Sequence, residues 1–337
     1  MGPHPAVAAA RSAVRAALPS GASLLVACSG GADSLALAAA VAFEAPRAGI
    51  GYGLVTVDHG LQPGSAAQAA HVAAIAAELG FDPVEVIPVE VRTDATAGGA
   101  ENAARTARYA ALDATARAWG AAVLLGHTLD DQAESVLLGL GRGSGPRSIA
   151  GMSVVTTSRL RSDGSAGARP AVTYVRPFLG LRRAQTLAAC EALGLEPWHD
   201  PQNDDAAFRR VRLRHEVLPL LEDVLAGGVA EALARTATQL QDLLNFLDQQ
   251  SAVADIRPGS SLDLEGVDGL PRAVRTELLR RWLGGELTAN HLDEVDRLIV
   301  DWRGQGPIDL PAGRSVVRSS GKLTVIPKSP QEHLSDE

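Results

Sequence analysis

The chain has 337 residues, of which 46% are hydrophobic and 21% charged, and its formal net charge is -8. This composition excludes a disordered chain, and the acidic balance argues against a protein that coats nucleic acid with a basic surface. Two cysteines, Cys28 and Cys190, are too few for a disulfide framework or a four-cysteine zinc site, so we expect a reducing, cytoplasmic location. No stretch reaches the roughly 20 apolar residues of a membrane helix. The apolar run before Cys28 imitates a lipoprotein signal, but Pro19-Ser20-Gly21 interrupts it, and we expect no membrane partner.

The charge is distributed unevenly along the chain. Residues 1–150 have a net charge of -4, residues 151–216 of +3, and residues 217–337 of -7. The basic middle segment is therefore the part suited to an anionic partner. Only two of the 31 basic residues are lysines, both near the C-terminus, which excludes a Walker lysine and a covalent lysyl-AMP in the first half.

The first half alternates short apolar runs with alanine-rich helical stretches, a pattern typical of a parallel sheet covered on both faces. We predict a doubly wound α/β fold, in which ligands bind at the carboxyl ends of the strands. The predicted strands are 23–28, 51–57, 84–90 and 121–126, and the predicted helices are 5–17, 34–43, 65–79, 101–119 and 129–140.

The second half begins with a predicted loop over 143–170, rich in Gly, Ser, Arg and Pro. The segments expected to follow are a strand at 171–175, a helix at 182–193, helical periodicity over 208–302 and a terminal hairpin ending near 326. We therefore predict a domain over 1–216 and a smaller, mainly helical domain over 217–337.

The first candidate functional segment along the chain is a glycine loop between a predicted strand and a predicted helix, Ser29-Gly30-Gly31-Ala32-Asp33-Ser34. Two glycines allow a tight turn with exposed amides, and a helix start adds positive charge, which together suit a phosphate or pyrophosphate. Asp33 could hold a Mg²⁺ on that group. The alternative is a plain glycine turn with a Ser or Asp helix cap. Asp58 and His59 follow the second strand and are expected at the same edge of the sheet.

Acidic residues follow the fourth strand, beginning three positions after His127. Asp130, Asp131 and Glu134 lie at the start of a predicted helix, where three carboxylates suit Mg²⁺ or the ammonium group of a substrate. The alternatives are a solvated acidic helix start for the carboxylates and a satisfied core histidine for His127. For Arg105, the alternative to a site residue is an ion pair with Glu101, four positions earlier.

Four arginines in six positions form the densest basic cluster of the chain. On a helix this spacing spreads the side chains over more than one face, so several should meet phosphates of a nucleic acid. A solvated charge run remains the alternative. The four are Arg209, Arg210, Arg212 and Arg214.

Several further motifs follow the glycine loop in a fixed order. They are Val57-Asp58-His59-Gly60-Leu61, Glu101-Asn102-Ala103-Ala104-Arg105, Gly126-His127 through Ser135, Arg142-Gly143-Ser144-Gly145, Arg176-Pro177, Asp200-Pro201-x-Asn203-Asp204 and Arg210-x-Arg212-x-Arg214. The glycine loop resembles the PP-loop of the ATP pyrophosphatase superfamily, and the order of these motifs is similar to the tRNA(Ile)-lysidine synthetase family. The resemblance covers about residues 21–220 closely and the tail more weakly. Two positions depart from the family pattern, Ser135 where threonine is usual and Val211 where asparagine is common.

The resemblance implies a PP-loop, HUP-like fold and an enzyme that uses ATP and Mg²⁺ to join L-lysine to C2 of cytidine-34 in a tRNA(Ile) with a CAU anticodon. Codon specificity then changes from AUG to AUA. It implies that Ser29 to Ser34, Asp58 and His59 bind ATP, that Asp33 binds Mg²⁺ and that Asp33, Arg105, His127, Asp131 and Glu134 act in catalysis. Asp130, Asp131, Glu134 and the four clustered arginines would bind lysine or tRNA.

The nearest alternative function is a PP-loop enzyme that inserts sulfur at C2 of a tRNA base. Such enzymes need paired catalytic cysteines or a cluster, and Cys28 and Cys190 form no Cys-x-x-Cys motif. A small-molecule synthetase gives no reason for the arginine cluster, and a non-enzymatic nucleotide-binding regulator gives none for the carboxylates. A homodimer is one oligomeric state that the sequence leaves open.

Overall fold

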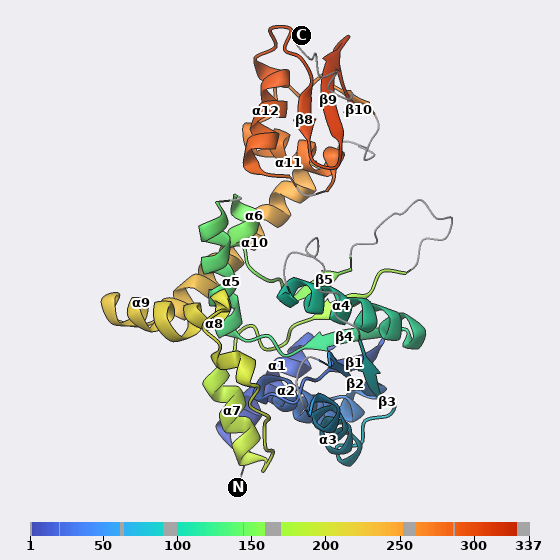
Figure 1. Ribbon diagram of the computed structural model, residues 1–337, viewed down its shortest axis with the longest axis vertical. Helices are drawn as coiled ribbons and strands as arrows, with labels where there is room; N and C mark the ends of the chain where they lie inside the picture. The colour runs from blue at the N-terminus through green and yellow to red at the C-terminus, as the bar shows by residue number, and fades with distance from the viewer. Residues whose placement is uncertain are drawn as a thin grey trace, which may run out of the picture. The chain divides into compact units, whose positions relative to one another are not determined.

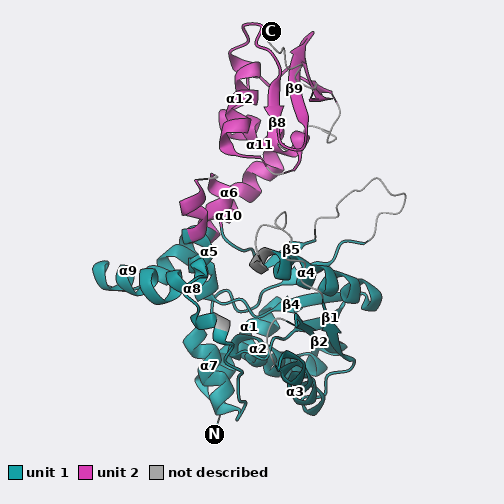
Figure 2. Ribbon diagram, viewed as in Figure 1, with its two compact units in different colours: residues 1–137, 151–237 teal, residues 138–150, 238–337 magenta. Residues whose placement is uncertain are grey.

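The computed structural model describes residues 2–19, 21–60, 64–89, 100–143, 145–158, 170–251, 261–285 and 287–328. The chain divides into two compact units (Figure 2). Residues 1–137 and 151–237 form the first unit, and residues 138–150 and 238–337 form the second.

The first unit is built on a six-stranded sheet with the order β3-β2-β1-β4-β6-β5 (Figure 1). All neighbouring strands are parallel except β5, which pairs antiparallel with β6 at the edge. The order reverses between β1 and β4, and in open parallel sheets ligands bind at the carboxyl ends of the strands at such a reversal. The strands are β1 (Ser23–Ala27), β2 (Tyr52–Asp58), β3 (Val84–Pro88), β4 (Ala121–Leu125), β5 (Val155–Thr157) and β6 (Thr173–Val175).

Helices cover both faces of this sheet because neighbouring strand residues point to opposite sides. Leu24 and Val26 of β1 belong to the core on the side of α1, α2, α3 and α7, whereas Leu25 belongs to the core on the side of α4. All three side chains are fully buried, as expected for a central strand. The covering helices are α1 (Pro5–Ala17), α2 (Ala32–Glu44), α3 (Ser65–Glu78), α4 (Ala100–Trp119) and α7 (Arg183–Ala192).

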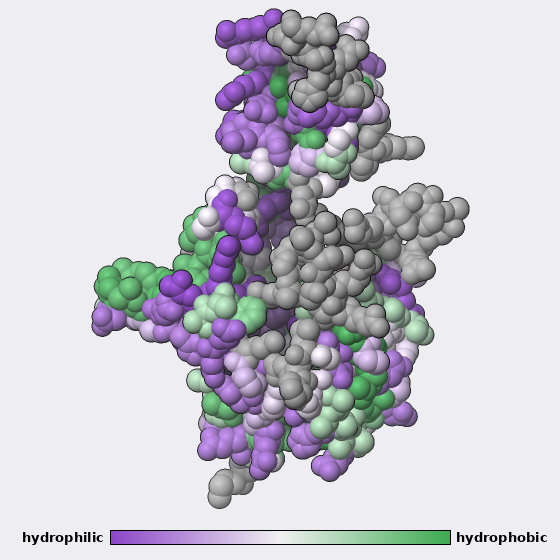
Figure 3. Space-filling model, in the orientation of Figure 1, coloured by the Kyte–Doolittle hydropathy of each residue, from purple (hydrophilic) through white to green (hydrophobic). Residues whose placement is uncertain are grey.

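Helix α5 continues from the carboxyl end of β4 and packs on the helices that follow α7. Leu129 and Ala133 of α5 form a small core with Leu218 and Ala230. Apolar side chains also gather on the surface over α9 (Figure 3), where Leu220 and Val224 are 61% and 68% exposed. The helical elements outside the sheet's covering layers are η1 (Pro46–Ala48), α5 (Leu129–Arg142), α6 (Pro146–Ile149), η2 (Pro201–Asp204), α8 (Arg209–Arg212), the π-helix η3 (Leu213–Val217), α9 (Leu218–Val224) and α10 (Val229–Ser251).

The second unit combines helices with an antiparallel sheet of the order β7-β10-β9-β8. Trp282 and Leu279 of α11 are fully buried against Val316 and Leu323 of the sheet. A buried ion pair between Arg275 and Asp296 ties α11 to α12. Its elements after α10 are β7 (Leu262–Asp263), α11 (Arg272–Leu283), α12 (Ala289–Val300), β8 (Ile308–Leu310), β9 (Arg314–Ser319) and β10 (Lys322–Pro327).

The predicted fold class, a doubly wound parallel sheet followed by a smaller domain, is confirmed, with differences in the second half. The predicted loop over 143–170 contains α6 and β5, which are too short to show periodicity. The predicted hairpin is β9–β10, but two further strands extend it to a four-stranded sheet. The predicted boundary after residue 216 lies inside the first unit, because Leu218 and Ala230 pack on α5. Within the described residues, no helix combines the length and the apolar character needed to cross a membrane.

Candidate active site and relatives of the chain

The glycine loop joins β1 to α2 with its backbone close to a neighbouring helix. Gly30 has a φ of +86°, a backbone conformation that favours glycine, and a Cβ there would lie 2.6 Å from Nε2 of Gln68 and 2.8 Å from Cγ2 of Val72. The hydroxyl of Ser34 donates to the carbonyl oxygen of Gly31 at 2.9 Å and accepts from the backbone N–H of Ser29 at 3.2 Å. The first-turn amides of α2 have no acceptors within the helix and face the carboxyl end of the sheet. This loop can therefore receive a phosphate.

The carboxyl end of β4 lies directly against the glycine loop. A Cβ on Gly126 would be 2.9 Å from the carbonyl oxygen of Asp33, closer than a Cβ atom approaches a backbone oxygen. The absence of a side chain at Gly126 thus allows the loop and the start of α5 to meet at the reversal of strand order.

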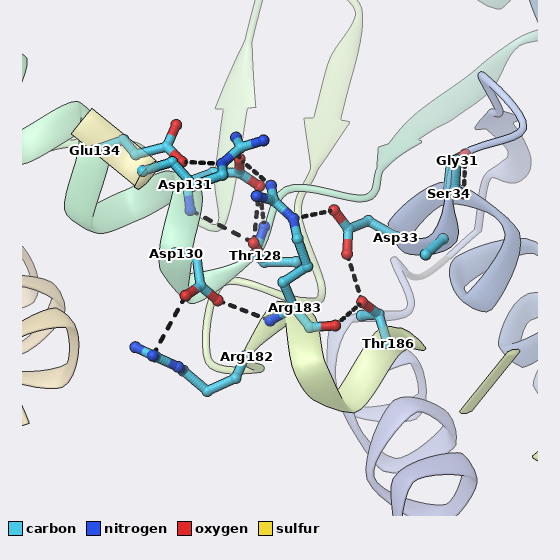
Figure 4. A network of polar contacts seen from close by, with 12 residues as sticks. Gly31, Asp33, Ser34, Thr128, Asp130, Asp131, Glu134, Arg182, Arg183 and Thr186 are labelled. Atoms are coloured by element: carbon cyan, nitrogen blue, oxygen red, sulfur yellow. Dashed lines mark hydrogen bonds and ion pairs between the residues drawn. The ribbon is translucent and has the colours of Figure 1, made fainter. Parts of the chain in front are cut away.

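A single arginine, Arg183, joins the carboxylates on the two sides of this junction (Figure 4). Its Nε donates to Oδ2 of Asp33 at 3.1 Å, and its Nη2 donates to Oδ1 of Asp131 at 2.8 Å. Its backbone N–H donates to Oδ2 of Asp130 at 2.7 Å. Thr186, one turn further along α7, donates its hydroxyl hydrogen to Oδ1 of Asp33. The loop, α5 and α7 therefore meet through one polar network.

The two aspartates joined by Arg183 have opposite pKa shifts. Burial raises the pKa of Asp33 above its usual value, although Arg183 and Thr186 oppose the shift. Burial also acts on Asp131, but Arg183 and two bonds from Thr128 outweigh it and lower the pKa of Asp131. The Thr128 backbone N–H and hydroxyl donate to Oδ2 of Asp131 at 2.8 and 2.9 Å, which fixes this carboxylate at the start of α5.

Glu134 lies one turn further along α5, and its side chain is fully buried. Oε1 accepts from Nε of Arg214 at 2.8 Å. Oε2 is buried with no hydrogen-bond donor, and Nη1 of Arg210 approaches it at 3.8 Å. Burial raises the pKa of Glu134, opposed by Arg214 and reinforced by the charge of Asp131. This site thus contains a carboxylate oxygen that can still accept a hydrogen bond.

The basic cluster divides between the site and the surface. Arg210 and Arg214, four residues apart, reach Glu134. Arg209 and Arg212 are exposed, and Arg212 forms a bidentate ion pair with Glu216 at 2.8–3.1 Å. Two of the four arginines therefore approach Glu134 and two are exposed, and the expectation that several of them meet phosphates stays a prediction.

His127, which follows β4, is neutral at physiological pH. Burial lowers its pKa to about 4, and its Nδ1 is buried without a hydrogen-bond partner. Burial also lowers the pKa of His59, whose Nδ1 has no partner either. Asp58 at the end of β2 accepts from the Gly60 backbone N–H at 2.9 Å.

Arg105 lies on α4 and interacts within its own helix. Its guanidinium lies over the ring of Tyr109, 4.8 Å from the centroid, and its charge contributes to the lowered pKa of His127. The side chain of Glu101 lies outside the described residues, so the expected Glu101–Arg105 alternative stays open.

The structure brings together six of the expected site residues: Asp33, Asp130, Asp131, Glu134, Arg210 and Arg214. Sequence reasoning missed Arg182, Arg183 and Thr186. The one feature of the sequence that could have indicated them is the pair of arginines at the start of a predicted helix. The helix dipole disfavours cations there, so another interaction must stabilise the two arginines. That interaction is with the acidic group they face, because Arg182 also approaches Asp130 at 3.5 Å.

Comparison with known proteins gives a consistent result along the chain. A PP-loop domain matches residues 7–221, and a TilS substrate binding domain matches residues 262–324. The tRNA(Ile)-lysidine synthase of Thermobifida fusca is 52% identical over 96% of this chain and 98% of its own. That of Streptomyces coelicolor is 49% identical over 97% of this chain and 99% of its own.

A solved structure of a U34-tRNA thiolase from Methanococcus maripaludis, with its [4Fe-4S] cluster, is similar with a TM-score of 0.54. It covers 70% of this chain and 80% of the thiolase at 16% identity, and this likeness shows the fold alone. The family is shown by the two matched domains and by relatives about half identical over nearly their whole length: this chain belongs to the tRNA(Ile)-lysidine synthase family.

Proposed function

We propose that the chain ligates L-lysine to C2 of cytidine-34 in the CAU anticodon of an isoleucine tRNA. The C2 oxygen attacks the α-phosphorus of ATP and pyrophosphate leaves; the lysine ε-amine then attacks C2, the bond to the adenylated oxygen breaks, and AMP leaves. The observation that carries this proposal is the junction of a phosphate-binding loop with the carboxylates of Asp33, Asp131 and Glu134 at one end of the sheet. A reaction between a nucleotide and an amine needs both a group that binds phosphate and carboxylates that bind the amine.

The loop from Ser29 to Ser34 is proposed to bind the phosphates of ATP. First-turn amides and the helix start attract anions. Asp58 and His59 end the neighbouring strand, and the unpartnered Nδ1 of His59 is suited to hydrogen-bond the nucleoside.

The proposed Mg²⁺ fits the donors present. Oxygens of Asp33 and Asp131 both contact one guanidinium, at 3.1 and 2.8 Å, so the two carboxylates are close enough for a single cation to lie between them. Carboxylates are ligands that Mg²⁺ prefers, and it keeps its remaining sites for water and phosphate oxygens. Bound there with Asp33 as a ligand, the ion would neutralise charge on the leaving pyrophosphate.

The lysine ε-amine is proposed to bind beside Asp131 and Glu134. Of these two, Glu134 is the better proton acceptor, because burial raises its pKa and one of its oxygens lacks a donor. Asp131, with its lowered pKa and three donors, is better suited to hold the cationic form before attack. Asp130, His127 and Arg105 are proposed to line the same site.

Binding of tRNA is proposed to use Arg209 and Arg212 on the first unit, together with the matched substrate-binding domain of the second. Both arginines are exposed, as a phosphate contact requires. The proposed location is the cytoplasm, where ATP, lysine and tRNA occur together. A homodimer is proposed as the assembly, supported by the exposed apolar side chains of α9, and light scattering would test it.

The function is tested by the mass of an isoleucine tRNA after incubation with the chain, ATP and lysine. The expected gain is one lysine less one water, with AMP formed in equal amount. Asp33→Ala should abolish AMP formation with an unchanged circular dichroism spectrum. A gain matching replacement of oxygen by sulfur, or no gain with lysine, would overturn the proposal.

A further inference from the structure

Arg183 occupies a position that a bound cation would need. Its guanidinium contacts Asp33 through Nε and Asp131 through Nη2, so it lies between the two carboxylates (Figure 4). These are the groups to which Mg²⁺ and the substrate amine are assigned above. A guanidinium and either cation cannot lie between the same oxygens together.

The contacts around Arg183 fix its backbone but would not be broken if another cation displaced its guanidinium. The backbone N–H of Arg183 is bonded to Asp130, and the hydroxyl of Thr186 is bonded to Asp33. Neither bond involves the guanidinium, so both can persist when the side chain rotates. The side chain is 29% exposed, so part of it already faces solvent.

Removal of this cation would leave two carboxylates of low exposure, 20% for Asp33 and 12% for Asp131, facing one another. Like charges in such a position raise the free energy of the ionised pair unless a cation compensates them. As long as both carboxylates are ionised, the pair therefore requires a compensating cation, either from the chain or from a ligand.

We propose that Arg183 is an internal counter-cation, which closes the Asp33–Asp131 pair to free divalent cations and is displaced when a nucleotide delivers its metal ion. The displaced guanidinium then becomes available to the negative charge on the pyrophosphate, which a fork of N–H donors binds well. The inference rests on the metal position of the proposed function. It makes Arg183 a positioning residue that determines the order of binding: the metal ion enters the site together with the nucleotide and does not bind there alone beforehand.

The experiment measures binding of Mn²⁺, a paramagnetic probe for Mg²⁺, to the full chain without nucleotide, by electron paramagnetic resonance and calorimetry. Arg183→Gln should bind one Mn²⁺ at least about tenfold more tightly than the unmodified chain, because the competing cation is gone. Arg183→Lys keeps a cation and should stay close to the unmodified chain. Asp33→Asn combined with Arg183→Gln should lose the gained site.

Arg15→Gln is the matched control, because it also removes a guanidinium from a buried carboxylate, that of Glu44. It should leave Mn²⁺ binding unchanged. Mn²⁺ should raise the melting temperature of Arg183→Gln more than that of the unmodified chain, a readout that also shows the variant to be folded.

Equal Mn²⁺ affinity in the unmodified chain and a folded Arg183→Gln variant would overturn the proposal. A gained site that survives Asp33→Asn would overturn it as well. Neither result depends on ligase activity, so failure of this inference and failure of the proposed function are distinguishable.

Discussion

Glu134→Gln tests the proposed proton acceptor, because the amide keeps the shape of the side chain and loses its basicity. In the structure this side chain is fully buried, with one oxygen bonded to Arg214 and the other without a donor. The amide oxygen can still accept from Arg214. The variant should therefore keep the arrangement of α5 and the arginines.

Two magnitudes separate the catalytic effect from the structural one. Weakening a hydrogen bond to a charged group costs about 1.5–3 kcal/mol of stability. We expect the lower half of that range, because Arg214 is 25% exposed and also approaches Asp131 at 3.6 Å. Loss of a positioned base lowers a rate by about 10²–10⁴, or roughly 2.7–5.4 kcal/mol at 1.36 kcal/mol per tenfold.

The assay measures the two half-reactions separately. Formation of the adenylated tRNA, followed as release of pyrophosphate, should change less than about tenfold, whereas transfer of lysine should fall by about 10²–10⁴. Glu216→Gln, on an exposed glutamate paired with Arg212, is the matched control and should transfer lysine normally. Lysine transfer by Glu134→Gln within tenfold of the unmodified chain, at saturating lysine, would refute the reasoning.

The pH dependence gives a second check on Glu134. A base acts deprotonated, so its step slows as the pH falls through its pKa. Burial raises the pKa of Glu134 above 4.5, which moves the acidic limb of lysine transfer toward neutral pH. This limb should disappear from the residual rate of Glu134→Gln; its persistence at the same pH would assign it to another group.

Three further substitutions test the site. Gly126→Ala places a Cβ 2.9 Å from the Asp33 carbonyl oxygen, so it should lower the free energy of unfolding by about 1–3 kcal/mol and raise the KM for ATP. Gly141→Ala is the control, because the space around its Cβ is open, and it should have neither effect. Thermal melts and steady-state rates compare the two variants. His127→Gln should lower the rate without changing the shape of the profile between about pH 5 and 8, because the pKa of His127 is about 4, and loss of a limb near 6.5 would contradict a neutral imidazole. Arg212→Ala should weaken tRNA binding and reduce its salt slope by about one, measured by filter binding at several salt concentrations; Arg15→Ala serves as the control, and an unchanged slope would exclude a phosphate contact.

The sequence predicted the central sheet because its signals are local. A fully buried strand must be apolar on both faces, and a phosphate-binding turn must contain glycine. Ser29 to Ser34 and the carboxylates after β4 follow strands that pair with one another, so the topology alone placed Asp33 near Asp131. Strand β5, with three residues, is too short for any alternation to appear.

Arg183 could not be predicted because its role depends on a contact between distant helices. It lies 150 positions from Asp33 and reaches it only because α7 packs against α2, where Cys190 donates to the carbonyl oxygen of Ala32. The division of the arginine cluster has a similar origin. Spacing shows that Arg210 and Arg214 share a face, but which face is inward is decided by Val211 and Leu218, whose burial fixes the rotation of the helix.

The interleaving of acidic and basic groups follows from the substrates that the site is proposed to bind. A triphosphate requires cations, whereas Mg²⁺ and an amine require carboxylates, so both signs must lie within a few ångströms of one another. Without ligands these groups form ion pairs with one another, as Arg183 does with Asp33 and Asp131 and Arg214 does with Glu134. Each ligand must then break an internal ion pair to bind. A cationic ligand releases an arginine, which favours binding of an anionic ligand, and an anionic ligand releases a carboxylate, which favours binding of a cationic ligand. Substitutions in this network should consequently be non-additive, because each one changes the charge that its neighbours must compensate.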